Sequence, residues 1–413
     1  MPVGPGGFRL TVRLVVLLMR LEPRMNERPL AIVPVWFYDD QTGYQDFRQR
    51  IGSLASRWRV IVVVRDARFL NELDDLSVSV EILPSPGGSR LQMLWWCLRL
   101  IPWIAKRNPD LVFLLGSQVA PVRLGLPASF PTVLYWNVHP SQLFDGNAPS
   151  RLARWLNIAS TRLSYFAAAR ASIVLPIGAR LREDLVAHGV HPLRAVTVPL
   201  GVSESHAAVR ALAPRRHLPG EPLRLIIAGS INAERGRDVM FEAIALLTKQ
   251  SLPVHLTLVG ATGPQLEECR SRVQRLGIQE QVTLLGRLPG QEIPAQLAKA
   301  HIGLSLVADR PWNYFNPPTK VYEYLANGLP VIVSDIACHR DLLAEGGPGW
   351  FCEFDARDFA RVIRERLENP SELELASKLA YQEGGKALWS RLEPDFISLC
   401  RAARNWGTSP AVI

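Results

Sequence analysis

A repeated alternation of short apolar runs with longer amphipathic runs constrains the fold of this chain most strongly. In the first half, the runs LAIVPVWFY (30–38), RVIVVVR (59–65) and DLVFLLG (110–116) are almost wholly apolar, as strands are when both faces of a parallel sheet are covered. Helix-like runs separate them, including YQDFRQRIGSLASRW (44–58) and the long stretch 150–170. The pattern predicts an α/β fold with a parallel sheet covered by helices on both faces.

An interruption near the middle of the chain divides this alternation into two parts. The segment GVSESHAAVRALAPRRHLPGEPLR (201–224) is rich in Ala, Pro and Arg, and the alternation begins again with LRLIIAGS (223–230). At 413 residues the chain is long enough for two domains of ordinary size. Open parallel sheets bind ligands at the carboxyl ends of their strands. We therefore expect two Rossmann-like, doubly wound domains that face each other across a ligand-binding cleft.

The expected division of the chain has five parts. They are an N-terminal tail or misassigned start (1–24), a first Rossmann-like domain (25–205), a linker (206–222), a second Rossmann-like domain (223–380) and a C-terminal helix that packs back on the first domain (381–413). The first part is apolar and basic, but Arg13 interrupts its apolar run and it lacks a small-residue cleavage site. It is either a frayed tail or sequence upstream of a true start at Met25, and we favour the second interpretation.

The net charge of +9 lies entirely in the first half of the chain. Residues 1–24 carry +3 and residues 25–212 carry +6, whereas residues 213–413 contain 23 basic and 23 acidic residues. This asymmetry predicts an anionic partner for the first half, such as a phospholipid surface, a phosphorylated acceptor or a nucleic acid. No nucleic-acid recognition motif accompanies the charge, so we do not expect a nucleic-acid partner.

Cysteines and carboxylates give no sign of a metal site. The five cysteines are scattered and include no CxxC pair, which predicts buried thiols in a reducing compartment rather than disulfides or structural zinc. The acidic pairs Asp39-Asp40 and Asp74-Asp75 are adjacent rather than spaced as metal ligands, and we interpret them as solvated loop residues.

One helix-like run, LQMLWWCLRLIPWIAKR (91–107), combines aromatic and basic residues on one face. Its stripe recurs at spacings of 3, 4 and 3 and consists of Trp96, Arg99, Trp103 and Lys106. Such a stripe is typical of a helix at an anionic membrane surface, but packing against neighbouring helices explains it equally well. The face that we expect in the core consists of Leu91, Leu94, Trp95 and Leu98. Additional basic surface is expected from Arg151, Arg154 and Arg162 on the next long helix.

The segment NPPTKVYEYLANGLPVIVSD (316–335) places two prolines, a Lys and a Glu at the start of a helix-like run. Prolines suit the first positions of a helix, because no N–H partner is needed there. We expect Thr319 to cap this helix and Lys320 to bring a positive charge to its first turn. A helix N-terminus with a neighbouring cation suits a phosphate.

Four segments of the chain resemble a known family. Residues 318–331 are similar to the signature P-x-K-x-x-E-y-x-A-x-G-x-P-V of the donor site in GT-B retaining glycosyltransferases of the group 1 (family 4) type. The other similar segments are ARASIVLPIGARLREDLVAHGV (169–190), RAVTVPLGVS (194–203) and LRLIIAGSINAERGRDVMFEAIALL (223–247). The resemblance implies two Rossmann-like domains, a nucleotide sugar as co-substrate without a further cofactor or metal, and transfer with retention.

The resemblance also implies roles for individual residues. Glu323 corresponds to the family's second signature Glu, which binds the donor ribose, and the alternative is a solvated helical carboxylate. Arg235 corresponds to the basic residue that contacts the diphosphate, and the alternative is a surface Arg at a helix start. His139 corresponds to a His that faces the donor sugar in many relatives, although a structural His is the commoner case. Gly43 occupies the region of the glycine-rich loop, where a turn glycine is an equally good interpretation.

Two positions depart from the family pattern. Ser230 stands where the family usually has a second diphosphate-binding Arg, and Phe315 stands where it often has a first Glu, eight residues before Glu323. We expect Lys320 to supply the missing charge at the diphosphate. The candidates to contact sugar hydroxyls in place of the first Glu are Asn313, Asn316 and Thr319.

The sequence therefore predicts an enzyme that transfers a hexose from a nucleotide sugar to a hydroxyl of a glycan or lipid-linked saccharide, in the synthesis of cell-surface polysaccharide or glycolipid. We expect it in the cytoplasm, with peripheral contact to the anionic inner membrane face. A nucleotide-sugar epimerase on the same fold is an alternative, but it requires further acid/base carboxylates. A non-catalytic binding or scaffold protein is the other alternative, favoured by Ser230 and Phe315. The base, the hexose and the acceptor are not encoded in a recognisable pattern.

Overall fold

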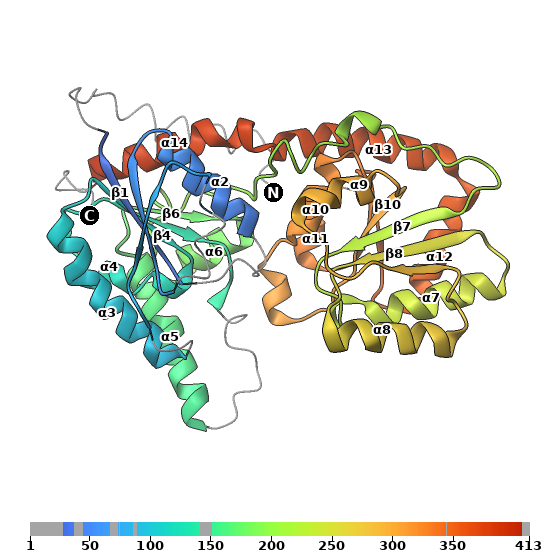
Figure 1. Cartoon of the computed structure of the whole chain (residues 1–413), viewed down its shortest axis with the longest axis horizontal. Helices are drawn as coiled ribbons and strands as arrows, with labels where there is room; N and C mark the ends of the chain where they lie inside the picture. The colour runs from blue at the N-terminus through green and yellow to red at the C-terminus, as the bar shows by residue number, and fades with distance from the viewer. Residues whose placement is uncertain are drawn as a thin grey trace. The chain divides into compact units, whose positions relative to one another are not determined.

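The structure of this chain, a computed structural model, divides into two compact units. The first unit comprises Met1–Pro199 and Leu392–Ile413, and the second comprises Leu200–Arg391. The residues that the structure describes are 28–36, 44–66, 73, 75–85, 89–140, 151–343 and 345–406. Within them, each unit contains a six-stranded parallel sheet (Figure 1).

The sheet of the first unit has the strand order β3-β2-β1-β4-β5-β6. Its strands are β1 (Leu30–Val35), β2 (Arg59–Val64), β3 (Ser79–Ile82), β4 (Leu111–Leu115), β5 (Thr132–Trp136) and β6 (Ile173–Pro176). All pairings are parallel, and Ile32 of β1 lies opposite both Ile61 of β2 and Val112 of β4. Both faces of the central strands are buried, which explains their apolar runs.

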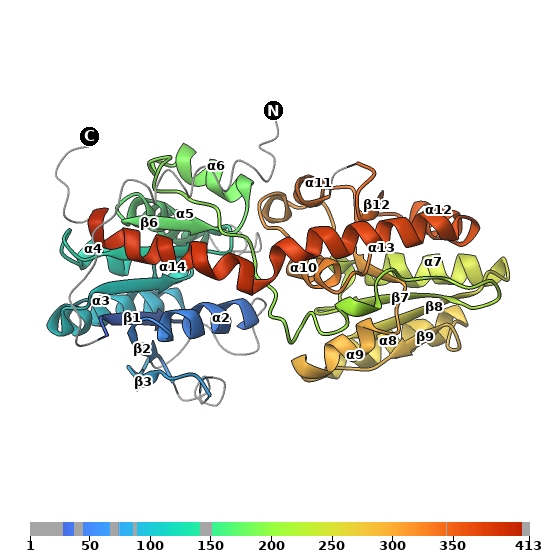
Figure 2. The ribbon, with the colours of Figure 1, turned by 90° about the horizontal axis from the view of Figure 1, so that it is seen from above.

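Helices cover both faces of this sheet. They are α2 (Tyr44–Ala55), α3 (Arg90–Arg107), α4 (Val122–Gly125), α5 (Arg151–Ala168), α6 (Ala179–Ala187) and α14 (Trp389–Trp406), with a short 3-10 helix η2 (Ser117–Val119). Figures 1 and 2 show α3, α4 and α5 on one face and α2 and α14 on the other. From Leu392 onward α14 belongs to the first unit, and the ring of its Phe396 meets Phe113 of β4 edge-on at 5.6 Å.

The faces predicted for α3 are wrong. Trp96 is fully buried and its Nε1 donates a hydrogen bond to the carbonyl of Leu83 at 2.6 Å, whereas Leu91, Trp95 and Leu98 are exposed. The residues that pack inward are Met93, Trp96, Cys97, Leu100 and Ile104. The helix is apolar on both of these faces, so periodicity alone did not select the face that the sheet covers.

The sheet of the second unit has the order β12-β11-β10-β7-β8-β9, which is the order of the first sheet counted within its own unit. Its strands are β7 (Leu223–Ala228), β8 (Val254–Val259), β9 (Val282–Leu284), β10 (Ile302–Ser305), β11 (Val331–Ser334) and β12 (Gly349–Cys352). The doubly wound α/β architecture that the sequence predicts for both halves is thus confirmed.

Successive residues of β7 point into two different cores. Leu225 and Ile227 pack in a core that α7, α8 and α12 cover, and Ile226 and Ala228 pack in one that α9, α10 and α13 cover. The helices are α7 (Arg237–Lys249), α8 (Gly263–Leu276), α9 (Ile293–Leu297), α10 (Thr319–Ala326), α11 (Ala337–Leu342), α12 (Ala356–Glu368) and α13 (Pro370–Gly384). The 3-10 helices are η4 (Arg210–Leu212), η5 (Ala233–Arg235), η6 (Gly290–Glu292), η7 (Pro311–Tyr314) and η8 (Gly385–Ala387).

The segment between Leu200 and β7 packs on the second unit. Val209 N donates to Asn327 Oδ1 at 3.3 Å, and the guanidinium of Arg210 donates to the carbonyl of Ala326 at 3.2 Å. The guanidinium of Arg215 donates to the carbonyl of Ala298 at 2.8 Å. These contacts hold residues 206–222 against the ends of α9 and α10.

The five cysteines are free and buried, as the sequence predicts. Within the described ranges, no helix combines the length and the apolar character that crossing a membrane requires.

Candidate functional site

The second sheet has its topological switch point between β7 and β10, where the strand order reverses. Ligands of open α/β sheets bind outside the carboxyl ends of the strands at such a point. β7 ends at Ala228, and Arg235 follows in η5. Lys320 and Glu323 lie in the first turns of α10, which follows β10 in the chain. The sequence-predicted donor residues Arg235, Lys320 and Glu323 therefore lie on segments that follow these two strands.

Two glycines bring the loops after β7 and β8 into backbone contact. Gly229 and Gly260 have positive φ values of 123° and 122°. A Cβ atom on Gly260 would lie 2.2 Å from the carbonyl oxygen of Gly229, which no larger residue tolerates. A Cβ on Gly229 would lie 3.8 Å from Cε and Nζ of Lys320, so the ammonium group of Lys320 lies beside this glycine loop.

Lys320 is a buried cation without a partner. Its side chain is buried, and its Nζ forms no hydrogen bond among the described residues. Burial lowers the pKa of Lys320 to about 7, and the positive charge of Arg235 lowers it further, whereas Glu323 raises it. Burial also lowers the pKa of Arg235. Two neighbouring cations, one of which forms no hydrogen bond with the described residues, favour the binding of an anion.

The N-terminus of α10 lies at the same place. Its N-cap is Pro318 and no side chain caps the helix, so the expectation that Thr319 caps it is wrong. Thr319 is instead the first helical residue, because the prolines set the extended backbone one position earlier. Uncapped N–H groups at this end add a partial positive charge to that of Lys320.

Glu323 lies one turn along α10 and is partly buried. Burial raises the pKa of its carboxyl to about 7, and Lys320 opposes this rise. The adjacent Tyr324 fixes the helix, because its Oη accepts a hydrogen bond from Ala228 N at 2.8 Å and its ring lies against Gly303.

A buried histidine that the sequence interpretation missed lies near these charges. His339 of α11 is fully buried, with Nδ1 2.8 Å from the carbonyl oxygen of Ser334 and Nε2 3.1 Å from Oγ of Ser305. Burial lowers the pKa of His339 to about 4, and the charges of Lys320 and Arg235 contribute to this fall. The imidazole is therefore neutral at neutral pH and ties the carboxyl end of β10 to that of β11.

The other predicted donor residues lie after β7 and around the start of α10. Ser230 is exposed in the loop after β7. Asn316 and Thr319 are partly buried at the start of α10, and Asn313 is buried, with Nδ2 donating to the carbonyl of Ala308 at 2.8 Å. Their contact with a sugar stays a prediction.

His139, in the first unit, belongs to a cluster of polar side chains near the carboxyl end of β5. Its Nε2 lies 3.2 Å from Oη of Tyr165 and 3.6 Å from Oδ2 of Asp184. The Tyr165 hydroxyl donates to Asp184 Oδ2 at 2.5 Å, and the ring of His188 stacks on Tyr165 at 3.9 Å. Burial acts to raise the pKa of Asp184, but hydrogen bonds from His139 and Tyr165 hold it below its usual value.

The members of this cluster other than His139 were not predicted, since α5 and α6 bring them together only in the fold. Gly43, predicted for a phosphate or acceptor loop, lies outside the described residues.

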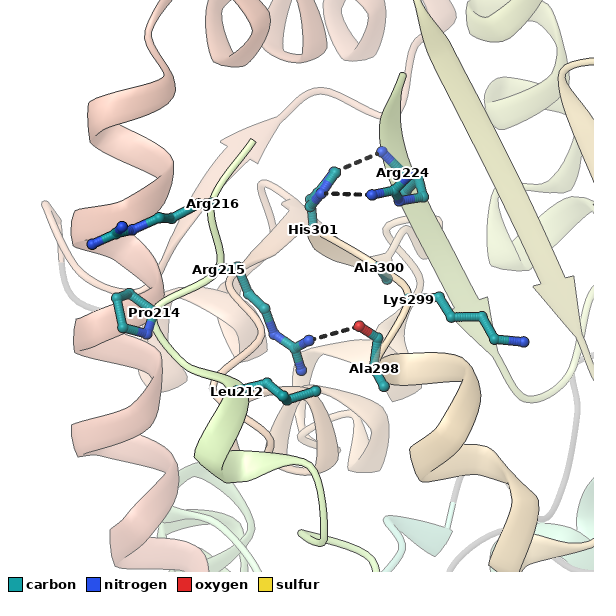
Figure 3. A pocket seen from close by; sticks show the side chains of 9 residues that line it. All are labelled: Leu212, Pro214, Arg215, Arg216, Arg224, Ala298, Lys299, Ala300 and His301. Atoms are coloured by element: carbon teal, nitrogen blue, oxygen red, sulfur yellow. Dashed lines mark hydrogen bonds between the residues drawn. The ribbon is translucent and has the colours of Figure 1, made fainter. Parts of the chain in front are cut away.

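A cavity of about 440 Å³ lies at the opposite, amino edge of the second sheet (Figure 3). It is lined by Arg215, Arg224 and His301 among others. Figure 3 shows the guanidinium of Arg215 turned to Ala298, and the side chains of Arg216 and Lys299 turned away from the cavity. The side chains of Arg216 and Lys299 therefore do not converge on this cavity.

Two family descriptions match the chain, one in each unit. "Glycosyl transferases group 1" matches residues 210–383, and "Glycosyl transferase 4-like domain" matches residues 45–201. The first range contains Arg235, Lys320 and Glu323, and the second contains His139.

Two curated relatives are similar over part of their length. Alpha-D-kanosaminyltransferase of Streptomyces kanamyceticus is 24% identical over 254 residues, which are 60% of this chain and 61% of that protein. The amylovoran biosynthesis glycosyltransferase AmsK of Erwinia amylovora is 25% identical over 198 residues, which are 47% of each chain. The chain thus matches between about half and three fifths of the length of these relatives.

Solved structures share the fold at low identity. The structure of HepE from Anabaena in complex with UDP-glucose has a TM-score of 0.68 and 14% identity, over 89% of this chain and 98% of that one. WaaG, a glycosyltransferase involved in lipopolysaccharide biosynthesis, has a TM-score of 0.65 and 16% identity, over 89% and 98%. Because the two family matches together span residues 45–201 and 210–383, and these solved structures share the fold over 89% of this chain, the chain belongs to the group 1 glycosyltransferases and has the GT-B fold.

Proposed function

We infer that this enzyme transfers a hexose from a nucleoside diphosphate sugar to a hydroxyl group of a glycan or lipid-linked saccharide, with retention of the anomeric configuration. The observation that carries this proposal is the buried ammonium group of Lys320, which has no partner among the described residues and lies close enough to Arg235 for the two charges to repel. A buried cation costs free energy unless a counter-charge binds to it. A diphosphate at the N-terminus of α10 supplies that charge.

The same groups stabilise the leaving group. In the transfer, the bond between the anomeric carbon and the diphosphate oxygen breaks, and its electron pair stays on the diphosphate. Lys320, Arg235 and the uncapped N–H groups of α10 are positive where this charge develops, in a site that is already largely desolvated. Glu323 accepts hydrogen bonds from the ribose hydroxyls of the donor and fixes its position.

The acceptor hydroxyl loses its proton as its oxygen bonds to the anomeric carbon. We assign this proton to the oxygen of the departing diphosphate, which lies on the same face of the sugar in a retaining transfer. His139 binds a hydroxyl of the sugar substrates, and Tyr165 and Asp184 hold its ring in place. None of these steps uses a bound metal ion, since Lys320 and Arg235 supply the charge.

The named activities of the similar proteins support the substrate classes. AmsK is a glycosyltransferase of amylovoran biosynthesis, and the solved structures include a lipopolysaccharide outer core galactosyltransferase, WaaB, and HepE with UDP-glucose. They favour an enzyme of cell-surface polysaccharide or lipopolysaccharide synthesis that uses a hexose donor. We place this enzyme in the cytoplasm.

A screen of UDP-, GDP- and ADP-sugars by isothermal titration calorimetry tests the donor site. We expect one class to bind, and Lys320→Met to weaken that binding about 100-fold, because a buried charge-assisted contact to phosphate is lost. Glu323→Gln should weaken it about tenfold. Lys299→Met is the matched control, since this exposed Lys lies at the other edge of the sheet and should leave binding unchanged.

Turnover separates the enzyme from its alternatives. Release of free nucleotide in the presence of a polysaccharide precursor, with the product anomer identified by NMR, supports the transferase. Donor binding without release over a panel of acceptors would indicate a scaffold protein. Conversion of the donor to another nucleotide sugar without an acceptor would indicate an epimerase.

A further inference from the structure

Two helices of the first unit expose large apolar side chains. On α3 they are Leu91, Trp95 and Leu98, and on α5 they are Trp155, Ile158 and Phe166, with exposed fractions between 47% and 66%. The spacings within each helix place its three residues on one side of that helix. Exposed apolar side chains that gather in this way mark an interaction surface rather than ordinary scatter.

The two helices belong to one layer. α4 contacts both α3 and α5, and Figures 1 and 2 show all three helices on the same face of the first sheet. The opposite sides of α3 and α5 are buried against the sheet, including Trp96 and Tyr165. The six apolar side chains therefore lie on the outer surface of a single layer, which we call the α3–α5 face.

The charge of this layer is entirely positive. The sequences of α3, α4 and α5 contain no Asp or Glu. Lys106, Arg151, Arg154 and Arg162 are exposed on it. Arg99 and Arg170 lie with their guanidinium groups over the rings of Trp95 and Phe166, at 4.6 Å and 3.4 Å from the ring centroids. Aromatic rings and cations thus alternate across the face.

An outer helix of the second unit shows that this pattern is not general to the molecule. On α12, Arg361 pairs with Asp358 at 2.8 Å and with Glu365 at 2.6 Å, so basic residues there have acidic neighbours on the same helix. Arg107 of α3 pairs with Glu81 of β3 at 2.8 Å, but the exposed Lys106, Arg151, Arg154 and Arg162 form no ion pair with the described residues. Their charges are therefore available to an external anion.

We propose that the α3–α5 face docks on the surface of an anionic phospholipid bilayer. Trp and Phe rings favour the headgroup zone, Leu and Ile side chains enter the acyl boundary, and Arg and Lys bind lipid phosphates. A second copy of the chain fits poorly, because a two-fold interface on this face would bring arginines against arginines. The proposal needs nothing from the donor site and goes beyond the proposed transfer.

Flotation of the full chain with lipid vesicles tests the proposal. We expect the chain to float with vesicles of phosphatidylcholine and phosphatidylglycerol and to bind vesicles of phosphatidylcholine alone at least about tenfold more weakly. The double variant Trp95→Ser, Trp155→Ser should bind the anionic vesicles at least about tenfold more weakly than wild type. Arg154→Gln with Arg162→Gln should weaken binding about tenfold and reduce its sensitivity to salt.

The matched control is Leu218→Ser with Leu375→Ser, which removes two exposed leucines from the second unit. It should bind vesicles as wild type does. Residues 1–24 are also basic, so they are kept in every variant.

The proposal is overturned if wild type does not float with anionic vesicles, or if the two-tryptophan variant floats as well as wild type. Dimers in size-exclusion chromatography without lipid, lost in the two-tryptophan variant, would instead make the face a contact between copies. Donor binding by calorimetry is measured on each variant and should stay unchanged, so this test fails or succeeds independently of the proposed transfer.

Discussion

The buried guanidinium of Arg50 in the first unit and the buried ammonium of Lys320 in the second are both largely hidden from water, yet their surroundings differ. Arg50 Nε donates to Asp46 Oδ2 at 2.8 Å and its Nη2 donates to Asp46 Oδ1 at 3.2 Å, while Tyr135 also donates to Asp46. Among the described residues, no carboxylate accepts a hydrogen bond from Lys320 Nζ, although the charge of Glu323 acts on it from nearby. Buried charges in native proteins are usually paired.

We propose that Arg50 has a structural role and Lys320 a functional one. The network around Arg50 joins α2 to β5, and a further hydrogen bond from Arg50 Nη2 reaches the carbonyl of Pro199 at 3.1 Å. Every one of these partners belongs to the chain, so the network stabilises the fold. The fold buries the charge of Lys320 without a hydrogen bond to the described residues, and we propose that a ligand satisfies it. Removing a charge should therefore have opposite effects on stability at the two places.

Breaking the paired network should have the largest effect. We expect Asp46→Ala to lower the free energy of unfolding by about 3–5 kcal/mol, because it leaves the buried Arg50 without its counter-charge. Urea unfolding followed by fluorescence measures the change. Asp75→Ala removes an exposed partner of Arg48 and should change little. If Asp46→Ala lowers the free energy of unfolding as little as Asp75→Ala does, the network does not stabilise the fold as we infer.

Removing the unpaired charge should stabilise the protein without donor. Lys320→Met replaces a buried cation by an apolar side chain of similar length, so we expect a gain of about 2 kcal/mol near pH 7. The pKa of Lys320 is about 7 in the folded state and near 10.5 when exposed. The protonated amine therefore destabilises the fold fully below pH 7, and this penalty disappears as the pH rises toward 10.5.

The gain from Lys320→Met should decrease accordingly between these two pH values. Thermal unfolding across this range provides the measurement, and Lys299→Met provides the control. A destabilised Lys320→Met variant would mean that the ammonium group has a protein partner after all, and the comparison with Arg50 would no longer hold.

The pH dependence of donor binding sharpens the same comparison. A bound diphosphate favours the protonated Lys320, whereas the free site loses this proton above a pH of about 7. We expect donor affinity to fall as the pH rises above that value, by at most about tenfold per pH unit, which corresponds to about 1.4 kcal/mol. Calorimetry in buffers of different ionisation enthalpy should show proton uptake on binding.

Lys320→Arg is the test variant, because a guanidinium stays charged over this range. At neutral pH the Lys320→Arg variant should bind the donor more weakly than wild type. Its affinity should not decrease further as the pH rises above neutral. A wild-type affinity that does not change with pH would exclude the titration of Lys320 as its cause.

Local sequence was sufficient for much of the fold. Both sheets follow from apolar runs that are buried on two faces, and the positions of Lys320 and Glu323 follow from the order of residues around one helix start. β3 was not predicted, because this short edge strand has partly exposed residues and no apolar run. The buried and exposed faces of α3 were predicted the wrong way round, because only packing against the sheet determines which of its two apolar sides is covered.

The protonation states in the site depend on contacts between residues that are far apart in the sequence. The hydrogen bond from Ala228 to Tyr324 joins residues 96 positions apart and packs α10 on β7. His339 meets Ser305 across 34 positions. No local sequence pattern indicates such contacts. The lowered pKa of Lys320 and the neutral state of His339 therefore could not be predicted from the sequence.

We expect the smallest effect in the cluster around His139, because its charged groups have partners within the chain. Asp184→Asn removes the carboxylate that orients His139, and we expect kcat to fall about fivefold with the donor Kd unchanged. Tyr165→Phe removes one hydrogen bond to Asp184 but keeps the carboxylate beside His139, so its effect should be smaller.

Steady-state kinetics over a range of pH distinguishes positioning from folding, because a purely structural defect would lower the active fraction equally at every pH. If Asp184→Asn has the kcat and pH profile of wild type, the cluster is structural, as the network of Arg50 is. The paired charges of the first unit would then stabilise its fold alone, and the charged groups that act on the donor would be confined to the second unit.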